Sequence, residues 1–229
     1  MKKILFLILT VINGRSITLT DKNSVSLIDT VNDDSISKII HDIYEISYNK
    51  EKNMYIYLNT PGGSVDDGNR LIETINYLKD KKNISCIAHN IASMGFVILQ
   101  ACPYRLGLTS SKVMQHQIST MLSDEKQRLK TYMNYIDSLE KELIHLQADR
   151  IKISYNKFIE NTYHNWWLTG KDALKNNIID EIVTIGCGKS LLKTNIKANV
   201  SVFTNIITIK TFSKCPLIHK PIDIKYETK

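Results

Sequence analysis

Between residues 25 and 101, β-prone runs alternate with segments whose apolar residues recur at helical spacing. Strands are expected at 25–31, 54–58 and 84–88, and a helical pattern follows each of them. Strands that alternate with helices in this way usually pair in parallel and are covered by the helices. The sequence therefore predicts an α/β fold with a largely parallel sheet and flanking helices.

The pattern changes between residues 124 and 151, where one apolar stripe continues over roughly seven helical turns. Its members are Leu129, Tyr132, Met133, Ile136, Leu139, Leu143 and Leu146. A long amphipathic helix of this kind is expected to pack against a partner or a second subunit, and the alternative is a core helix of the same chain. Helical character returns at 173–178, a strand is expected at 179–183, and 200–209 is β-prone.

Three short segments together contain the groups needed for nucleophilic catalysis. Ser93 follows a predicted strand and opens a helix, Gly62 and Gly63 form a turn after another strand, and His116 lies further along. A serine hydroxyl needs a neighbouring base to accept its proton, and the resulting oxyanion needs fixed N–H donors. Taken singly, Ser93 could instead be a helix cap, His116 an ordinary core or surface histidine, and the glycines a plain turn.

The order and spacing of these segments resemble the proteolytic subunit of the Clp protease, the ClpP family of serine peptidases. The similarity covers residues 24–183. It rests on four motifs, which are Tyr55–Ser64 (YIYLNTPGGS), Ala92–Gly95 (ASMG), Ser111–Gln117 (SKVMQHQ) and Leu168–Ala173 (LTGKDA), the last followed by Ile178-Ile179-Asp180.

The resemblance implies a ClpP/crotonase-like fold and a serine endopeptidase that works through an acyl-enzyme intermediate. It implies Ser93 as nucleophile, His116 as general base, and the N–H groups of Gly63 and Met94 as the oxyanion hole. Residues 124–151 would be the family's handle helix, which joins two heptameric rings. The expected partners are unfolded proteins or peptides, further subunits and an AAA+ ATPase, and no metal or organic cofactor is expected.

The third position of the triad departs from the family pattern. The family's aspartate precedes the Leu-Thr motif by three residues, and this position is Asn165 here. An asparagine does not stabilise an imidazolium ion as a carboxylate does. Asn165 could orient His116 in a slow enzyme, another acid could replace it, or the chain could be inactive.

Two alternatives to an active ClpP-like peptidase follow from these departures. The first is a catalytically impaired structural subunit that assembles through the 124–151 helix, favoured by Asn165 and by the absence of glycine from residues 118–122. The second is a membrane-associated enzyme that resembles signal peptide peptidases and uses a Ser–Lys dyad. The apolar N-terminus fits this second reading, whereas no lysine is clearly placed as a base.

The charge of the chain is concentrated at its C-terminal end. The net charge is +7, and residues 184–229 contain eight lysines against Asp223 and Glu227. No arginine stripe accompanies the charge, so nucleic-acid binding is not expected. We expect a peptidase domain over residues 21–183, an N-terminal apolar extension over 1–20 and a basic C-terminal extension over 184–229.

The N-terminus and the cysteines give information on the cellular compartment of the protein. Lys2 and Lys3 precede an apolar run at 4–12, which fits either a secretory signal or a buried strand. A cytoplasmic location is favoured, with a secretory or organellar one as the alternative. Cys86 and Cys102 lie in apolar segments and are interpreted as core thiols, whereas Cys187 and Cys215 could pair in an oxidising compartment.

Overall fold

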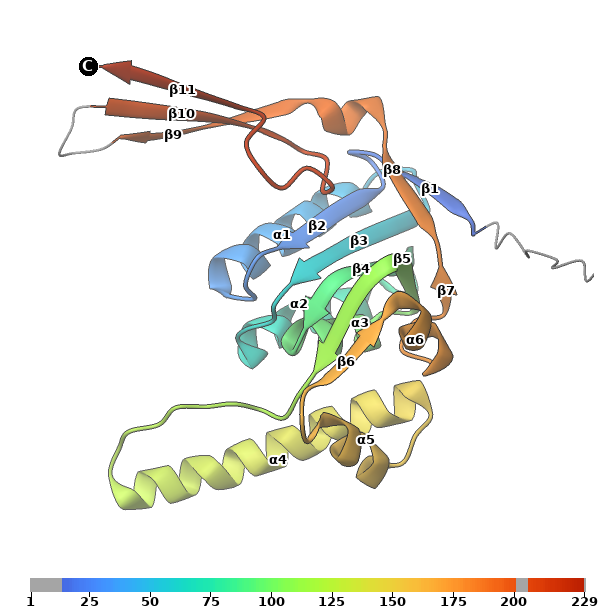
Figure 1. The fold of residues 1–229 in the computed structure, drawn as a ribbon, viewed down its shortest axis with the longest axis vertical. Helices are drawn as coiled ribbons and strands as arrows, with labels where there is room; N and C mark the ends of the chain where they lie inside the picture. Colours follow the sequence, from blue (N-terminus) through green and yellow to red (C-terminus); the bar gives the residue numbers. More distant parts are fainter. Residues whose placement is uncertain (1–13, 201–205, 229) are drawn as a thin grey trace, which may run out of the picture.

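A six-stranded sheet forms the centre of the structure (Figure 1). The computed structural model describes residues 14–200 and 206–228. The strands follow the order β2-β3-β4-β5-β6, and β7 lies beside β5. Their bounds are Ser24–Ile28 (β2), Asn53–Thr60 (β3), Asn83–Ala92 (β4), Tyr104–Gln115 (β5), Trp166–Thr169 (β6) and Glu181–Ile182 (β7). Strands β2 to β5 and β7 pair in parallel, and only β6 runs antiparallel to its neighbour. The predicted α/β architecture is therefore confirmed.

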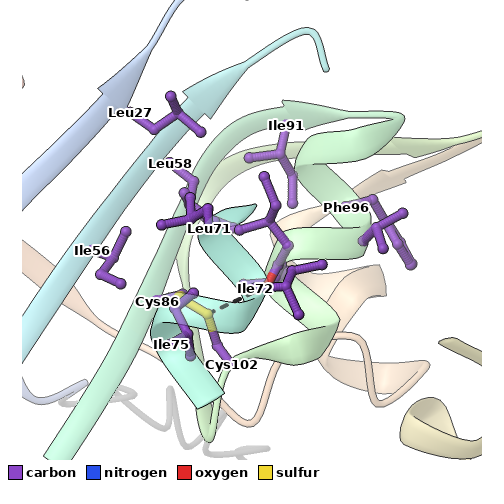
Figure 2. Close-up of a cluster of buried hydrophobic side chains, with 14 of the residues drawn as sticks. Leu27, Ile56, Leu58, Leu71, Ile72, Ile75, Cys86, Ile91, Phe96 and Cys102 are labelled. Carbon is purple, nitrogen blue, oxygen red and sulfur yellow. Dashed lines mark hydrogen bonds between the residues drawn. A yellow bond between two sulfur atoms is a disulfide. The ribbon is translucent and has the colours of Figure 1, made fainter. Parts of the chain in front are cut away.

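Three helices cover one face of this sheet, as the hydrophobic spacing predicts. They are α1 (Asp33–Ser47), α2 (Val65–Leu78) and α3 (Met94–Ala101). Asn32 caps α1 by accepting a hydrogen bond from the N–H of Ser35, and the N–H of Asn32 in turn donates one to the hydroxyl of Ser35. Figure 2 shows the core beneath α2, where Leu71 and Ile75 pack with the strand residues Ile56 and Leu58.

The opposite face of the sheet has a second, smaller core. Tyr57, Ile87 and Leu106 alternate with residues of the first core, because successive side chains of a strand point to opposite faces. They are covered by β1 (Ser16–Leu19) and β8 (Thr184–Cys187), which pair in parallel with each other. The two sheet faces therefore bury separate apolar clusters.

The predicted long helix is α4 (Lys126–Ile151), and it extends beside the sheet together with α5 (Tyr155–Thr162) (Figure 1). Only its C-terminal part is buried, at Ile144, Gln147, Ala148 and Ile151. The N-terminal part exposes apolar side chains, among them Tyr132, Met133 and Tyr135. The buried face is offset from the predicted stripe, because Leu143 packs only partly against the core and Leu146 is exposed. The stripe residues Tyr132 and Met133 are left uncovered in the single chain.

The C-terminal part of the chain forms a separate three-stranded antiparallel sheet. It follows α6 (Gly170–Lys175) and a short 3-10 helix, η1 (Lys189–Leu192), and consists of β9 (Thr194–Val200), β10 (Ile206–Ser213) and β11 (Asp223–Thr228). The apolar run at 4–12 lies outside the described residues. Among the described residues, none of the helices combines the length and the apolar character that a membrane span requires.

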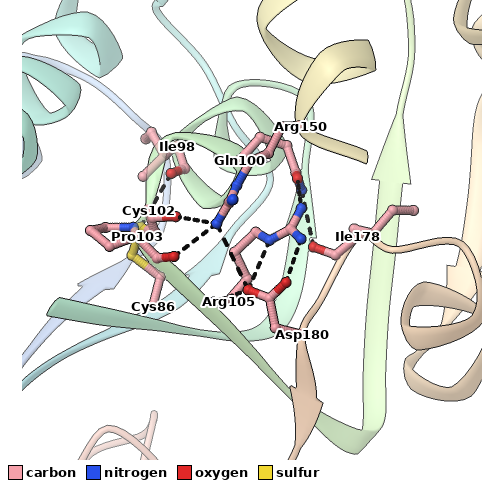
Figure 3. Close-up of a disulfide and its surroundings, with 9 residues drawn as sticks. All are labelled: Cys86, Ile98, Gln100, Cys102, Pro103, Arg105, Arg150, Ile178 and Asp180. Carbon is pink, nitrogen blue, oxygen red and sulfur yellow. Dashed lines mark hydrogen bonds and ion pairs between the residues drawn. A yellow bond between two sulfur atoms is a disulfide. The ribbon is translucent and has the colours of Figure 1, made fainter. Parts of the chain in front are cut away.

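The interpretation of Cys86 and Cys102 as core thiols was wrong, because the two residues form a disulfide (Figure 3). Cys86 lies opposite Arg105 in the β4–β5 register, and Cys102 lies two residues before the start of β5, so the topology brings the two Cα atoms to 6.0 Å. Cys187 and Cys215 form a second disulfide, the pairing that the sequence left open. It ties β8 to the end of β10 and closes the C-terminal segment into a loop.

Removal of either disulfide is expected to lower the free energy of unfolding by about 3 kcal/mol, because a crosslink restricts the unfolded chain. The pairs Cys86→Ala/Cys102→Ala and Cys187→Ala/Cys215→Ala should each show this loss in urea titrations under non-reducing conditions. In a thiol-reducing buffer, which opens both disulfides, the wild type should lose about the sum of the two effects. Alkylation of the unreduced, denatured chain should modify no cysteine, and modification of all four would contradict the pairing.

Beside the first disulfide, a buried arginine is held by a carboxylate from the other end of the domain (Figure 3). The side chain of Arg105 is 4% exposed, and it forms an ion pair with Asp180, which is 26% exposed. Asp180 also accepts a hydrogen bond from the backbone N–H of Arg105 at 2.8 Å, and Gln100 accepts one from the guanidinium at 2.6 Å. Arg150 of α4 lies 3.8 Å from the same carboxylate. The cluster therefore joins α3, β5, α4 and the segment before β7.

Candidate active site

A cleft of about 440 Å³ opens where the carboxyl ends of β3, β4 and β5 meet α4 and α5. Four of the five predicted site residues line it, namely Gly63, Ser93, Met94 and His116. Asn165, the fifth, is not among the lining residues. The parallel topology explains the grouping, because the carboxyl ends of neighbouring parallel strands lie at the same edge of a sheet.

Ser93 occupies a sharp turn between β4 and α3. Its backbone angles are φ 54° and ψ −122°, which a non-glycine residue rarely adopts. It stands at the N-cap of α3, yet its hydroxyl makes no capping hydrogen bond. The reading of Ser93 as an ordinary helix cap therefore loses its support. In α/β-hydrolases the nucleophilic serine also lies on a strained turn between a strand and a helix.

The glycine turn after β3 packs directly against the Ser93 turn. Gly62 and Gly63 have φ values of 91° and 147°, and a Cβ atom added to Gly62 would lie 2.7 Å from Cβ of Ser93 and 2.8 Å from N of Met94. Gly62 is thus required both for its backbone conformation and for the close approach of the two turns. The turn is held from behind by Val31, whose N–H donates to the carbonyl of Gly62 at 2.8 Å.

Two backbone donors beside the cleft are left without a partner. Over residues 14–200 and 206–228, no acceptor takes a hydrogen bond from the N–H of Gly63 or of Met94. The N–H of Met94 is free because it belongs to the first turn of α3, where a helix has no internal acceptor. The neighbouring Ser64 N–H, by contrast, donates to the carbonyl of Val31 at 2.9 Å. These free donors line the same cleft as Ser93.

His116 directly follows β5, and the connection to α4 is fixed beneath it. The side chain of Gln115 accepts a hydrogen bond from the backbone N–H of His116 at 3.1 Å and donates one to Gln147 of α4. Gln147 in turn donates to the carbonyl of Leu143 at 2.7 Å. In the described part of the chain no hydrogen bond joins the imidazole of His116 to Ser93 or to Asn165.

Asn165 immediately precedes β6, the strand that pairs with the end of β5. In this antiparallel ladder Gln115 lies opposite Trp166, so continuing the register by one step would pair His116 with Asn165. The ladder ends there, because Asn165 adopts a left-handed conformation with φ 48° and its side chain is exposed. The sequence position of Asn165 is thus next to His116 along the sheet, but its side chain is exposed and does not line the cleft.

The sequence interpretation missed the residues that α4 and α5 contribute to the cleft. Leu143 and Phe158 add apolar surface, Gln147 adds a buried amide, and Glu140 adds a carboxylate. The signal was present, because Glu140, Leu143, Ile144 and Gln147 recur at helical spacing and share one face of α4. Of these four residues, the sequence interpretation assigned only Leu143 to the apolar stripe.

No metal-binding group lies in the cleft as far as the described residues go. The group within them that could hold a metal ion consists of His41, Asp42 and Glu45 on α1. His41 and Glu45 are exposed on the surface of the helix, and exposed acidic groups of this kind are common without an ion.

Comparison with known proteins identifies the family. The family model described as Clp protease matches residues 13–186. The ATP-dependent Clp protease proteolytic subunit of Borreliella afzelii is 31% identical over 156 residues, which cover 67% of this chain and 79% of that protein. Proteolytic subunit 1 of Borreliella burgdorferi is also 31% identical, with 67% and 80% covered. The subunit of Borrelia garinii subsp. bavariensis is 32% identical, with 60% and 71% covered. The ClpP-like fold predicted from the motifs is thereby confirmed, and the chain belongs to the Clp protease family.

Proposed function

We propose that the chain is a serine endopeptidase in which Ser93 is the nucleophile, His116 the general base, and the N–H groups of Gly63 and Met94 the oxyanion hole. The observation that carries the proposal is the Ser93 turn. Its hydroxyl does not cap α3, its backbone is strained, and two unpartnered N–H groups share its cleft. Strain of this kind persists where a fixed geometry is needed for function.

The reaction follows from these groups. The oxygen of Ser93 attacks the peptide carbonyl while the imidazole of His116 accepts the hydroxyl proton, and the two N–H groups stabilise the tetrahedral oxyanion. His116 then gives the proton to the leaving amine, and the C–N bond breaks to leave an acyl-enzyme. A water molecule, deprotonated by His116, hydrolyses the ester and restores Ser93. Asn165 would act only by orienting the imidazole.

The proposal is tested with fluorogenic peptides and two variants. Ser93→Ala should reduce hydrolysis to the background rate, and His116→Ala should reduce kcat/KM by about 10²- to 10⁴-fold, the usual contribution of a general base. Ser119→Ala, which removes another hydroxyl beside the cleft, serves as the control and should keep most of the activity. Activity that survives in Ser93→Ala would refute the assignment.

The His116→Ala variant also separates this mechanism from a Ser–Lys dyad. An enzyme that used lysine as the base would keep its activity without His116. None of the residues that line the cleft is a lysine, which favours the histidine mechanism.

A second function, that of an assembly subunit with little activity of its own, is favoured by the triad position and by the surface of α4. Asn165 stands where the family has an aspartate, and the described residues contain no hydrogen bond between Ser93 and His116. The uncovered apolar end of α4 fits contact with further subunits in a ring. The relatives are named ATP-dependent, so an ATPase partner is part of this proposal too. Ring assembly in a mass measurement, without hydrolysis of peptides, would favour this second function.

A further inference from the structure

The wall of the cleft is apolar and neutral except at one place. Glu140 of α4 is the only aspartate, glutamate, lysine or arginine among the lining residues, and His116 is the only other titratable side chain there. The remaining wall consists of glycine turns, amides, hydroxyls and apolar side chains such as Val97 and Phe158. A substrate in the cleft therefore meets a single fixed negative charge.

The carboxylate of Glu140 is held in position by the segment that follows His116. One oxygen, Oε1, accepts a hydrogen bond from the backbone N–H of Ile118 at 3.0 Å. No further hydrogen bond or ion pair of Glu140 is present in the described residues, which leaves its second oxygen available. The side chain is partly buried. The hydrogen bond to Ile118 thus fixes the position of the carboxylate, and the second oxygen remains free to bind a cation.

Within residues 14–200 and 206–228, no cationic side chain forms an ion pair with Glu140. The positions three and four residues away along α4, where helical side chains meet, hold Ile136, Asp137, Leu143 and Ile144. The facing segment 117–123 carries no charge at all. Asp137 adds a second negative charge on the same side of the helix. A partly desolvated carboxylate without a counterion attracts a cationic group more strongly than a solvated one does.

We propose that Glu140 makes the cleft selective for peptides that carry a lysine or arginine side chain. The selectivity rests on the proposed peptidase function, since it assigns the preferred substrate class to the same cleft. The ammonium or guanidinium group would donate to the free oxygen of Glu140 in a charge-assisted hydrogen bond, the stronger kind of hydrogen bond in proteins. Glu140 is here a specificity residue and takes no part in bond breaking.

A binding measurement tests the proposal without depending on catalysis. Labelled decapeptides with blocked ends, each carrying one lysine at a different position in a neutral sequence, are compared with peptides that carry norleucine there. In the Ser93→Ala background, fluorescence polarisation should show at least one lysine peptide binding about tenfold or more tightly than its norleucine counterpart. The ratio should fall when salt is raised from about 0.05 to 0.5 M, because salt screens a partly exposed ion pair.

The decisive comparison adds Glu140→Gln to this background. Glutamine keeps a side-chain oxygen that can accept from Ile118, so the substitution removes the charge while leaving the fold of the segment intact. We expect the lysine-to-norleucine ratio to drop to within about twofold of unity. The matched control is Glu142→Gln on the exposed side of α4, which should leave the ratio unchanged.

Two outcomes overturn the proposal: equal binding of all lysine and norleucine pairs, and a lysine preference that survives Glu140→Gln. Either can occur while Ser93-dependent hydrolysis is intact, in which case the peptidase function stands and the selectivity fails. The opposite result is also distinguishable. If the wild type hydrolyses no peptide but Glu140→Gln abolishes a lysine preference, the peptidase function is refuted and the binding selectivity is retained.

Discussion

Asn165→Asp is expected to raise the rate at which Ser93 is acylated by at least about tenfold. A carboxylate beside the imidazole stabilises the positive charge that develops when His116 takes the Ser93 proton, and it fixes the productive tautomer. The reverse change in a chymotrypsin-type protease lowers kcat by about 10⁴-fold, which sets a ceiling for the gain. The gain should remain well below this ceiling because Asn165 is exposed.

The backbone at this position accommodates the change. Asn165 has φ 48°, and asparagine and aspartate are the residues that tolerate this conformation best after glycine. The register of β5 and β6, continued by one step, places Asn165 opposite His116 just beyond the end of the ladder.

The rate is measured as the second-order constant for inactivation by a fluorophosphonate, alongside kcat/KM for a peptide. Asn177→Asp is the matched control, since Asn177 is another exposed asparagine in a left-handed conformation (φ 56°) and does not line the cleft. An Asn165→Asp variant no faster than wild type would show that position 165 does not act on His116.

Asp180→Ala is expected to lower the free energy of unfolding by about 3–5 kcal/mol, the cost of leaving a buried charge without its partner. Arg105 is 4% exposed and would keep only the Gln100 oxygen as a side-chain acceptor. The variant also loses the acceptor of the Arg105 backbone N–H. Urea titration of wild type and variant gives the loss directly.

The surface pair one residue away supplies the control. Glu181 forms an ion pair with Arg15 at 3.0 Å, and the Arg15 side chain is 48% exposed. Exposed pairs contribute between about 0 and 1 kcal/mol, so Glu181→Gln should change stability by no more than that. A loss of similar size in both variants would contradict the view that burial of Arg105 makes the Asp180 pair important.

The same carboxylate should make stability depend on acid. Burial alone would raise the pKa of Asp180, but the hydrogen bonds and charge of Arg105, together with the charge of Arg150, outweigh it and hold the pKa below its ordinary value. The group therefore stabilises the fold fully above the unfolded pKa of about 4, and this stabilisation is lost as pH falls through the lower folded value. Asp180→Ala should be less sensitive to pH in this range.

The sequence predicted best those elements whose apolar pattern is continuous. Helix α1 follows from Ile36, Ile39 and Ile43, whose buried face recurs at helical spacing. Strand β3 follows from the β-prone run Met54–Leu58, which is buried on both faces of the sheet. The sequence did not predict the first part of β5, where Tyr104, Arg105 and Gly107 break the expected apolar run. Arg105 is buried there only because Asp180, 75 residues later, provides the opposite charge.

The candidate site shows the same division between local and distant information. Ser93, His116 and the glycine turn were predicted as a group because each lies in a short motif. The disulfide between Cys86 and Cys102, and the presence of Glu140 in the cleft, depend on how α3 and α4 pack against β5. The helical spacing on α4 shows which of its residues share a face, but the elements that this face contacts are set by tertiary packing.

The central claim is that Ser93 is an activated nucleophile, and mapping of a fluorophosphonate adduct tests it most directly. Intact-mass measurement of wild type should show one phosphonyl group for each chain, and peptide mapping should locate it on Ser93. The Ser93→Ala variant should carry no adduct, and His116→Ala should react much more slowly than wild type. An adduct that maps to another serine, such as Ser64 or Ser119, or labelling that persists at the wild-type rate in Ser93→Ala, would contradict the account.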